Sequence, residues 1–278
     1  MYLIFDTETT GLPRNYNAPM SDLENWPRLV QLAWQLHDDK GRLVSNNNFI
    51  VKPEGFTIPY NSEKIHGIST QRALKEGHDL EKVLEIFEVD LKNSSYLVGH
   101  NIGFDISIVG AELLRTNKSI EDLEKEPLDT KNISTEFCAI PGGKGGKFKW
   151  PTLIELHQRL FGEGFGDAND AAYDVDATAK SFFGLIKEGV QPPAEGVTIE
   201  EIVYEAPNLE AANFAAAKDE VKLSAKKVLK AADGADITDL KDTPFTHLHV
   251  HTQFSILQST SEIPAVIKRA KSLGMPAL

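Results

Sequence analysis

Four acidic residues interrupt apolar segments of the chain in positions where they could bind metal ions. Asp6 and Glu8 stand two residues apart at the end of a short apolar run, so a strand there points both side chains to one face. Asp105 follows GHNIGF at the start of a predicted helix, and Asp174 lies near the start of a later one. Each acid alone could be a helix cap or a surface charge, but the four together favour a metal site. Because clustered carboxylates repel each other without a cation, and two Mg²⁺ ions are the usual arrangement for cutting phosphodiesters, the pattern predicts nuclease chemistry.

Strands and helices alternate over the first 190 residues, in an order that would position these acids. Short apolar runs predict strands over 2–8, 29–38, 42–53 and 96–101. Helical spacing of apolar residues predicts helices over 80–93, 104–116, 151–162 and 170–189. A meander of strands followed by strand–helix alternation indicates an α/β fold, with a mixed sheet flanked by helices.

Composition limits the class of protein. The chain has 278 residues and one cysteine, Cys138, so it has no internal disulfide and fits a reducing cytoplasm. It has no apolar run that could cross a membrane and no secretory signal, so we expect no membrane partner. The net charge of −12 argues against binding nucleic acid by bulk electrostatics, but a metal-loaded acidic cleft could still hold one strand end.

The composition changes after Gly189. Residues 191–243 are predicted to form a partly helical linker, because they have good helix propensity but only a thin apolar stripe. Residues 244–278 contain a strand-like run and an amphipathic helix, which are too short to bury a core alone. We expect them to be the truncated start of a further domain.

Three segments resemble, in order, the motifs of the DEDD family of 3′–5′ exonucleases. They are FDTETTGL (5–12), GHNIGFDISIV (99–109) and DAAYDVDATAKSFF (170–183). Two further segments are similar to the DEDDh group related to the epsilon subunit of bacterial DNA polymerase III: HGIS (66–69) and KWPTLIELHQRLFG (149–162). The resemblance covers residues 1–190 and implies an RNase H-like exonuclease fold that proofreads DNA 3′ ends, single-stranded or frayed from a primer.

The resemblance also assigns a role to each acid in binding two Mg²⁺ or Mn²⁺ ions. It implies that Asp6 binds both ions, that Glu8 and Asp174 bind the ion nearer the attacking water, and that Asp105 binds the other. The DEDDh branch has its general base, a histidine, five positions before the last aspartate, and Asn169 stands there in this chain. Asparagine can hold a water but cannot accept its proton near neutral pH, so we expect an intact metal site with attenuated catalysis.

No neighbouring residue offers a clear replacement for that base. The DEDDy branch has a tyrosine four positions before the last aspartate, where this chain has Asp170, a carboxylate that the metal site would repel or take as an extra ligand. Tyr173 is one residue from Asp174 and would point elsewhere on a helix, and His157 is interpreted as a packing or surface residue.

Residues that flank the acids are candidates for binding the terminal nucleotide. They are Thr7, Thr9, Gly11, Leu12, His100 and Asn101. A structural role is the favoured alternative for His100, as it is for His66, because both lie in motif-like turns. The stretch PGGKGGKFKW (141–150) lacks the spacing of a P-loop, and its lysines Lys144, Lys147 and Lys149 either lie near DNA phosphates or are solvated.

The run HLHVHT (247–252) has alternating histidines, a spacing suited to metals that favour imidazole. It resembles the opening motif of the PHP domain of the DNA polymerase III alpha subunit, which implies His249 and His251 as paired ligands. The remaining PHP motifs are absent, so we expect no competent metal site there. The order of the two resemblances indicates an epsilon-like exonuclease fused ahead of a replicative polymerase, with the rest of the alpha chain and replisome subunits as partners.

Three functions share these features. An attenuated 3′–5′ DNA exonuclease is favoured by the four intact carboxylates. An inactive module that binds primer ends or polymerase subunits is the alternative suggested by Asn169. An RNA-directed exonuclease would have the same motifs, and only the polymerase-like segment argues against it.

Overall fold

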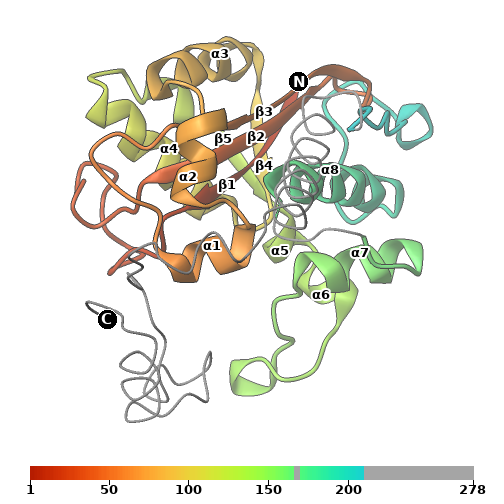
Figure 1. The fold of residues 1–278 in the computed structure, drawn as a ribbon. Coiled ribbons are helices and arrows are strands. Elements are labelled where there is room, and N and C mark those ends of the chain that lie inside the picture. The colour runs from red at the N-terminus through yellow and green to blue at the C-terminus, as the bar shows by residue number, and fades with distance from the viewer. Residues whose placement is uncertain (166–169, 210–278) are drawn as a thin grey trace, which may run out of the picture. The chain divides into compact units, whose positions relative to one another are not determined.

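A computed structural model describes residues 1–165 and 170–209, which form a mixed five-stranded sheet with helices on both faces (Figure 1). The strand order is β3-β2-β1-β4-β5. The strands are β1 Tyr2–Thr9, β2 Leu29–His37, β3 Leu43–Ile50, β4 Tyr96–Gly99 and β5 Glu126–Asp129. Because β1 pairs antiparallel with β2 and parallel with β4, it is the central strand. The predicted mixed sheet flanked by helices is confirmed.

The helices of the described chain fall into two groups, those that the apolar spacing predicts and those that it does not. The predicted group consists of α3 Leu80–Asn93, α4 Ile102–Arg115, α7 Leu153–Phe161 and α8 Ala171–Lys187. The other group consists of α1 Tyr60–His66, α2 Thr70–Glu76, α5 Thr130–Ile133 and α6 Thr135–Cys138. The second group and strand β5 have at most seven residues each, which is too short for a period to be recognised in the sequence.

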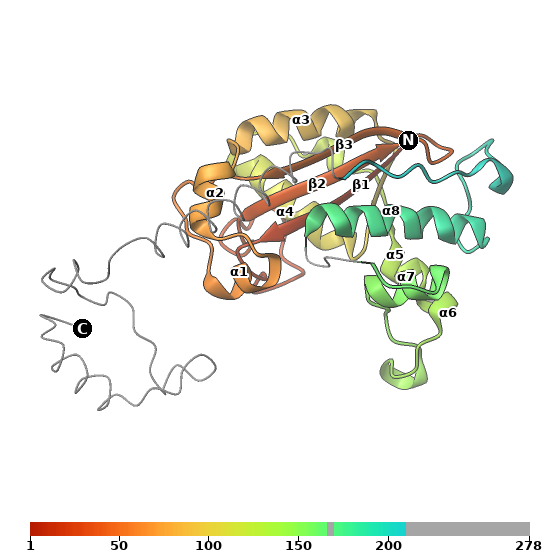
Figure 2. The same cartoon turned by 45° about the vertical axis from the view of Figure 1, so that its right-hand side comes forward.

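The alternation of side chains along β1 decides which helix each acid faces. Phe5 points to the layer of α3, where its ring lies 5.3 Å from that of Phe87. Tyr2 points to the opposite layer, where its ring lies 5.0 Å from that of Phe182 on α8. Figure 2 shows α8 lying across one face of the sheet, with α3 and α4 on the other. Asp6 and Glu8 are in phase with Tyr2, so the strand directs both acids toward the layer of α8.

Residues beyond 190 also pack on this fold. The backbone of Val203 donates to the carbonyl of Lys40 at 2.8 Å, and the ring of Tyr204 lies 6.1 Å from that of Phe183. Gly41 allows this approach, because a Cβ there would meet the Val203 carbonyl oxygen at 2.4 Å. The packed chain therefore continues past the expected domain end at residue 190. The rest of the predicted linker and all of residues 244–278 lie outside the described residues.

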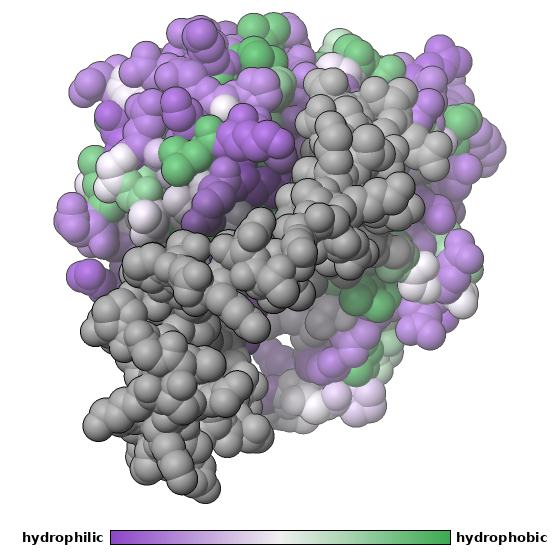
Figure 3. Space-filling view, viewed as in Figure 1, coloured by the Kyte–Doolittle hydropathy of each residue, from purple (hydrophilic) through white to green (hydrophobic). Residues whose placement is uncertain are grey.

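The surface of the described chain is mostly hydrophilic where Figure 3 shows it, and hydrophobic side chains form small separate groups there. Within the described residues, no helix is both long and apolar enough to cross a membrane. The hydrophobic groups on this face are therefore candidates for individual contacts rather than for one broad docking surface.

Candidate active site

Three of the four acids meet where the end of β1 passes the first turn of α8. Asp6, Glu8 and Asp174 each offer a carboxylate oxygen, and these atoms all lie within 4.8 Å of one another. Asp170 caps the N-terminus of α8 by accepting a hydrogen bond from the backbone of Ala172 at 3.1 Å. This cap begins the helix at Ala171, so Asp174 falls in its first turn, on the side of the strand that carries the other two acids.

Asp105 is a close charged neighbour of Asp6 and approaches β1 from the opposite face of the sheet, the side of α4. It lies in the first turn of α4 and is only 3% exposed. One of its oxygens accepts two hydrogen bonds from Thr7, at 3.0 Å from the backbone nitrogen and at 2.6 Å from the hydroxyl. Thr7 therefore orients Asp105, a role that the sequence does not reveal because it depends on contact between residues 98 positions apart.

Burial and nearby carboxylates raise the pKa values of three of these acids, Asp6, Glu8 and Asp105. Burial raises the pKa of Glu8 to about 8, and neighbouring carboxylates add to the shift. Burial likewise raises the pKa of Asp105 to about 7, against the opposing hydrogen bonds from Thr7, and raises that of Asp6 well above its usual range. Among the described residues, no lysine, arginine or histidine forms an ion pair with Asp6 or Glu8.

This arrangement fits divalent metal ions. Hard oxygen ligands that converge within a few ångströms are what Mg²⁺ and Mn²⁺ bind, and their charge compensates for the repulsion among the acids. Asp6, Glu8 and Asp174 are partly exposed, so a substrate can reach the group. The donor set and its electrostatics thus agree with the nuclease chemistry expected from the sequence.

The residues after Glu8 form a loop that is fixed by hydrogen bonds of Thr9 and Thr10. The Thr9 hydroxyl donates to the carbonyl of Gly11 at 2.7 Å, which fixes the start of the loop after β1. Thr10 and Arg28 exchange two hydrogen bonds, so the loop is closed at its base by the residue that precedes β2. Leu12 is 75% exposed, so its side chain is available for apolar contact with a nucleotide.

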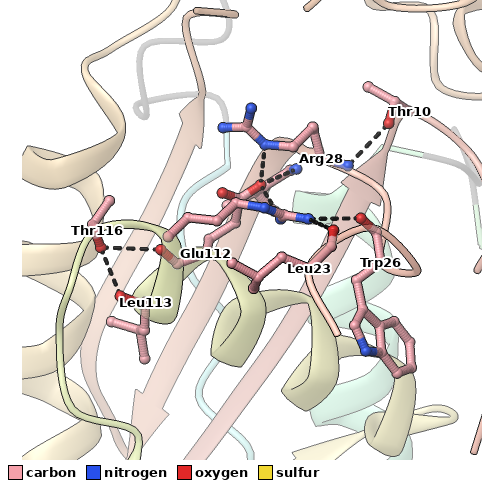
Figure 4. Close-up of polar contacts among 9 residues, drawn as sticks. Thr10, Leu23, Trp26, Arg28, Glu112, Leu113 and Thr116 are labelled. Atoms are coloured by element: carbon pink, nitrogen blue, oxygen red, sulfur yellow. Dashed lines mark hydrogen bonds and ion pairs between the residues drawn. The ribbon is translucent and has the colours of Figure 1, made fainter. Parts of the chain in front are cut away.

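A buried ion cluster holds this loop against α4, and Figure 4 shows it. Glu112 is fully buried, and its Oε1 atom accepts from Arg28 Nε and from the backbone of Leu29, both at 2.9 Å. Arg115 lies 3.1 Å from the same oxygen and donates to the carbonyls of Leu23 and Trp26. The connection between β1 and β2 is thereby fastened to the helix that carries Asp105. The sequence analysis missed Glu112, although an acid inside the apolar stretch IVGAELL (108–114) is the signal that marks it.

The N-terminus of α4 brings His100 and Asn101 into a second group of contacts. The His100 ring bonds to the Thr130 hydroxyl and to the Pro151 carbonyl, both at 3.0 Å, and burial lowers its pKa. This geometry favours the structural interpretation of His100. Asn101 caps α4 with a left-handed backbone (φ 79°), and its backbone donates to Asp129 at 2.9 Å. Its amide oxygen accepts from Lys131.

His66 and His157 make structural contacts, whereas the predicted position of the general base lies outside the described residues. Asn169 lies outside the described residues, so its place in the site stays a prediction. His66 is buried and accepts from the backbone of Ile68 at 3.1 Å, in keeping with a structural role in its turn. His157 is buried, bonds to the carbonyl of Glu163 at 2.8 Å and packs on Phe161, in keeping with a packing role.

Comparison with known proteins agrees with this geometry. A family model described as an exonuclease matches residues 3–182, and a PHP domain model matches residues 247–278. The DNA polymerase III PolC-type of Staphylococcus aureus (strain bovine RF122) is 28% identical over 197 residues, and that of Streptococcus pneumoniae (strain D39) is 28% identical over 187 residues. Each match covers 67% of this chain and 11% of the relative, so the chain spans about a tenth of the length of these curated relatives.

Solved structures show the same fold. E. coli exonuclease I in complex with a dT13 oligonucleotide has a TM-score of 0.54 and 19% identity, over 67% of this chain and 40% of that chain. The apo form of exonuclease I has a TM-score of 0.53 at the same identity, over 67% of this chain and 42% of that chain. The RNase H-like exonuclease fold expected from the sequence is thereby confirmed.

Proposed function

Because the chain belongs to the exonuclease family, we propose that it is a metal-dependent 3′–5′ proofreading exonuclease that removes terminal nucleotides from DNA. The observation that carries the proposal is the convergence of Asp6, Glu8 and Asp174 within 4.8 Å, with Asp105 beside them. Deoxyribonucleic acid is favoured over RNA as the substrate, since the curated relatives are DNA polymerases and the similar exonuclease I structures hold DNA oligonucleotides.

The larger protein that we propose is a bacterial replicative DNA polymerase III in which an epsilon-like exonuclease precedes the alpha chain. The PHP match after the exonuclease match supports this order. Fusion would raise the effective concentration of the nuclease at a frayed primer end in the cytoplasm. We keep residues 191–243 as a linker and 244–278 as the start of a PHP domain, and the packing of Tyr204 argues for cutting an isolated nuclease after residue 209 rather than 190.

In the proposed mechanism, Asp6, Glu8, Asp105 and Asp174 would hold two Mg²⁺ or Mn²⁺ ions. When bound, such ions supply an acidified water as nucleophile and stabilise the charge on the leaving 3′-oxygen. Thr7 keeps Asp105 in place through its two hydrogen bonds. Leu12 contacts the terminal nucleotide. Asn169 orients the attacking water without accepting its proton, so turnover is attenuated by the lack of a base.

Digestion of a 5′-labelled DNA primer with a mismatched 3′ end, in Mn²⁺, tests this proposal. We expect slow shortening from the 3′ end by the natural chain. Asn169→His should raise turnover at least about tenfold, from the usual size of general-base help. Asp174→Ala is the matched control and should be inactive, because it removes an oxygen ligand from the cluster.

The same assay separates the alternatives. Absence of shortening by both the natural chain and Asn169→His, with DNA binding retained, would establish the inactive binding module that Asn169 suggests. Faster digestion of an RNA oligonucleotide of the same sequence would replace the DNA substrate with RNA.

A further inference from the structure

The segment between α6 and α7 differs in charge from the rest of the protein. From Phe137 to Ile154 it contains three lysines and no acidic residue, whereas the whole chain has 41 acidic and 29 basic residues. Figure 1 and Figure 2 both show this segment projecting from the fold. It carries two exposed aromatic residues, Phe148 at 39% and Trp150 at 64% of their surface.

Trp150 is unlike the other two tryptophans of the chain. Trp26 and Trp34 are 3% and 0% exposed, and the indole N–H of each is hydrogen-bonded, to the Pro19 carbonyl and to Asp90 respectively. Trp150 contributes little to the hydrophobic core, because most of its ring is in contact with solvent. Its exposure therefore calls for an explanation by binding rather than by packing.

A short series of contacts links Trp150 to the N-terminus of α4, the helix that carries Asp105. The Nζ atom of Lys131 lies 4.8 Å from the centre of the Trp150 ring and donates to the side chain of Asn101. Asn101 caps α4, whose first turn carries Asp105. The carbonyl of Pro151, the residue that follows Trp150, bonds to His100 at 3.0 Å. Trp150 is thus tied to the end of α4 through both Lys131 and the residue that follows it.

The loop before Trp150 is closed at its base, so the ring has a defined position. The backbone of Lys149 donates to the carbonyl of Ile140 at 2.8 Å, and that of Gly143 to the carbonyl of Lys147 at 3.0 Å. A Cβ on Gly143 would meet the carbonyl oxygen of Phe148 at 2.2 Å, so glycine is required at this crossing. The Lys149 side chain is paired with Glu155 at 2.7 Å. The other two lysines of the loop, Lys144 and Lys147, are therefore the candidates for contacts with phosphates.

We infer that Trp150 and Lys131 form a subsite that stacks on an unpaired base of the DNA strand whose 3′ end is cut. This inference rests on the proposed function for the identity of the strand. A base of any identity can stack on the exposed part of the indole, because every base has a π-face. The ammonium of Lys131, which lies over the same ring, supplies the positive charge for the adjoining backbone phosphate. Such tolerance suits a nuclease that must bind any primer end. Lys144 and Lys147 extend the positive charge along the strand.

Binding of a phosphorothioate oligothymidylate of about 12 nucleotides, a length that covers one such site, tests the inference without cleavage. The full chain is titrated and its intrinsic fluorescence followed, since Trp26 and Trp34 are buried and Trp150 is exposed. We expect quenching on binding. Trp150→Ala should weaken affinity at least about fivefold and abolish the quenching, while Trp150→Phe should retain most of the affinity because it can still stack.

Two lysine variants, one inside and one outside the proposed subsite, test the role of the positive charge. Lys131→Ala should weaken binding and reduce its dependence on salt, because it removes a phosphate contact. Lys92→Ala, an exposed lysine on α3, should leave both unchanged. Unchanged affinity in Trp150→Ala, together with no quenching of the natural chain by the oligonucleotide, would overturn the inference and would point to a protein partner for the exposed indole.

The two proposals can fail separately. Quenching by DNA in a chain that digests no primer would reject the nuclease and keep the subsite. Primer digestion by the natural chain, with unchanged affinity in Trp150→Ala, would reject the subsite and keep the nuclease.

Discussion

Glu112 and the group formed by Asp6, Glu8, Asp105 and Asp174 are all buried or half-buried acids, yet their charges are compensated in different ways. Glu112 is fully buried between two arginines and a backbone N–H, all within 3.1 Å of one oxygen. The group beside α8 has mainly other carboxylates as charged neighbours, and the pKa values of Asp6, Glu8 and Asp105 are raised. A buried acid that supports the fold is paired within the chain, whereas acids gathered without such pairs require a cation from solution.

Helix α4 contributes one acid to each of the two groups, and the two acids have different roles. Helix α4 carries Asp105 in its first turn and Glu112 two turns later. Asp105 faces the strand that holds Asp6, and Glu112 fastens the loop that continues this strand beyond the acids. The paired acid thus positions the elements that hold the clustered acids together. Mutations in the two groups should therefore have opposite effects on stability and activity.

The largest expected effect is on activity, from Asp6→Asn. Removal of this ligand should lower exonuclease turnover by about 1000-fold or more, because the acidification of the attacking water depends on the bound ions. The same change should raise the Tm of the metal-free protein at alkaline pH, where the carboxyls are ionised and repel one another. The measurements are primer digestion and thermal melting in EDTA. A lower Tm together with full activity would mean that Asp6 supports the fold, as Glu112 does, and does not bind a metal ion.

Glu112→Gln should have the converse effect. It leaves two arginines without their anion, at a cost of about 3 kcal/mol, the lower end for a broken buried pair because glutamine retains one acceptor. For a domain of this size the Tm should fall by about 6–12 °C. Turnover measured well below the new Tm should fall far less than in Asp6→Asn. Arg72→Gln, which breaks a pair on α2, is the control and should change the Tm by less than about 3 °C.

A smaller effect concerns pH. The raised pKa values of Glu8 (about 8) and Asp105 (about 7) mean that folding favours the protonated carboxyls. Their stabilising contribution is present in full below the unfolded values near 4 and is lost as the pH rises through 7 and 8. The Tm of the metal-free protein should therefore decline between about pH 5 and pH 9. Saturating Mn²⁺ should remove most of the decline, and Glu8→Gln should make it shallower. An equal slope in Glu8→Gln would place its origin elsewhere.

The sequence predicts the long elements and the acids because each depends on a local pattern. The apolar period over 80–93 coincides with α3, and the spacing of Asp6 and Glu8 on one strand directs both to one face. The ties between distant segments are not predictable in this way. The bond from Thr7 to Asp105 and the pairing of Glu112 with Arg28 join residues 98 and 84 positions apart, and no period in the sequence encodes them.

The same limit applies to the end of the packed chain. The drop in apolar content after Gly189 suggests a boundary, but a few residues such as Ile202 and Tyr204 are enough to dock the next segment on the sheet. The exposure of Trp150 is equally invisible in sequence, since a tryptophan is as compatible with a core as with a surface. The prediction for Asn169 still rests on the resemblance alone.

The most direct test of the account is a calorimetric titration of Mn²⁺ at pH 7 into the natural chain, Asp6→Asn and Glu112→Gln. We predict that the natural chain and Glu112→Gln bind two ions each and release protons, so that the heat depends on the buffer, because the clustered carboxyls are partly protonated without metal. Asp6→Asn should lose this binding. Equal binding by all three chains, or no binding by the natural chain, would contradict the claim that the clustered acids form a metal site.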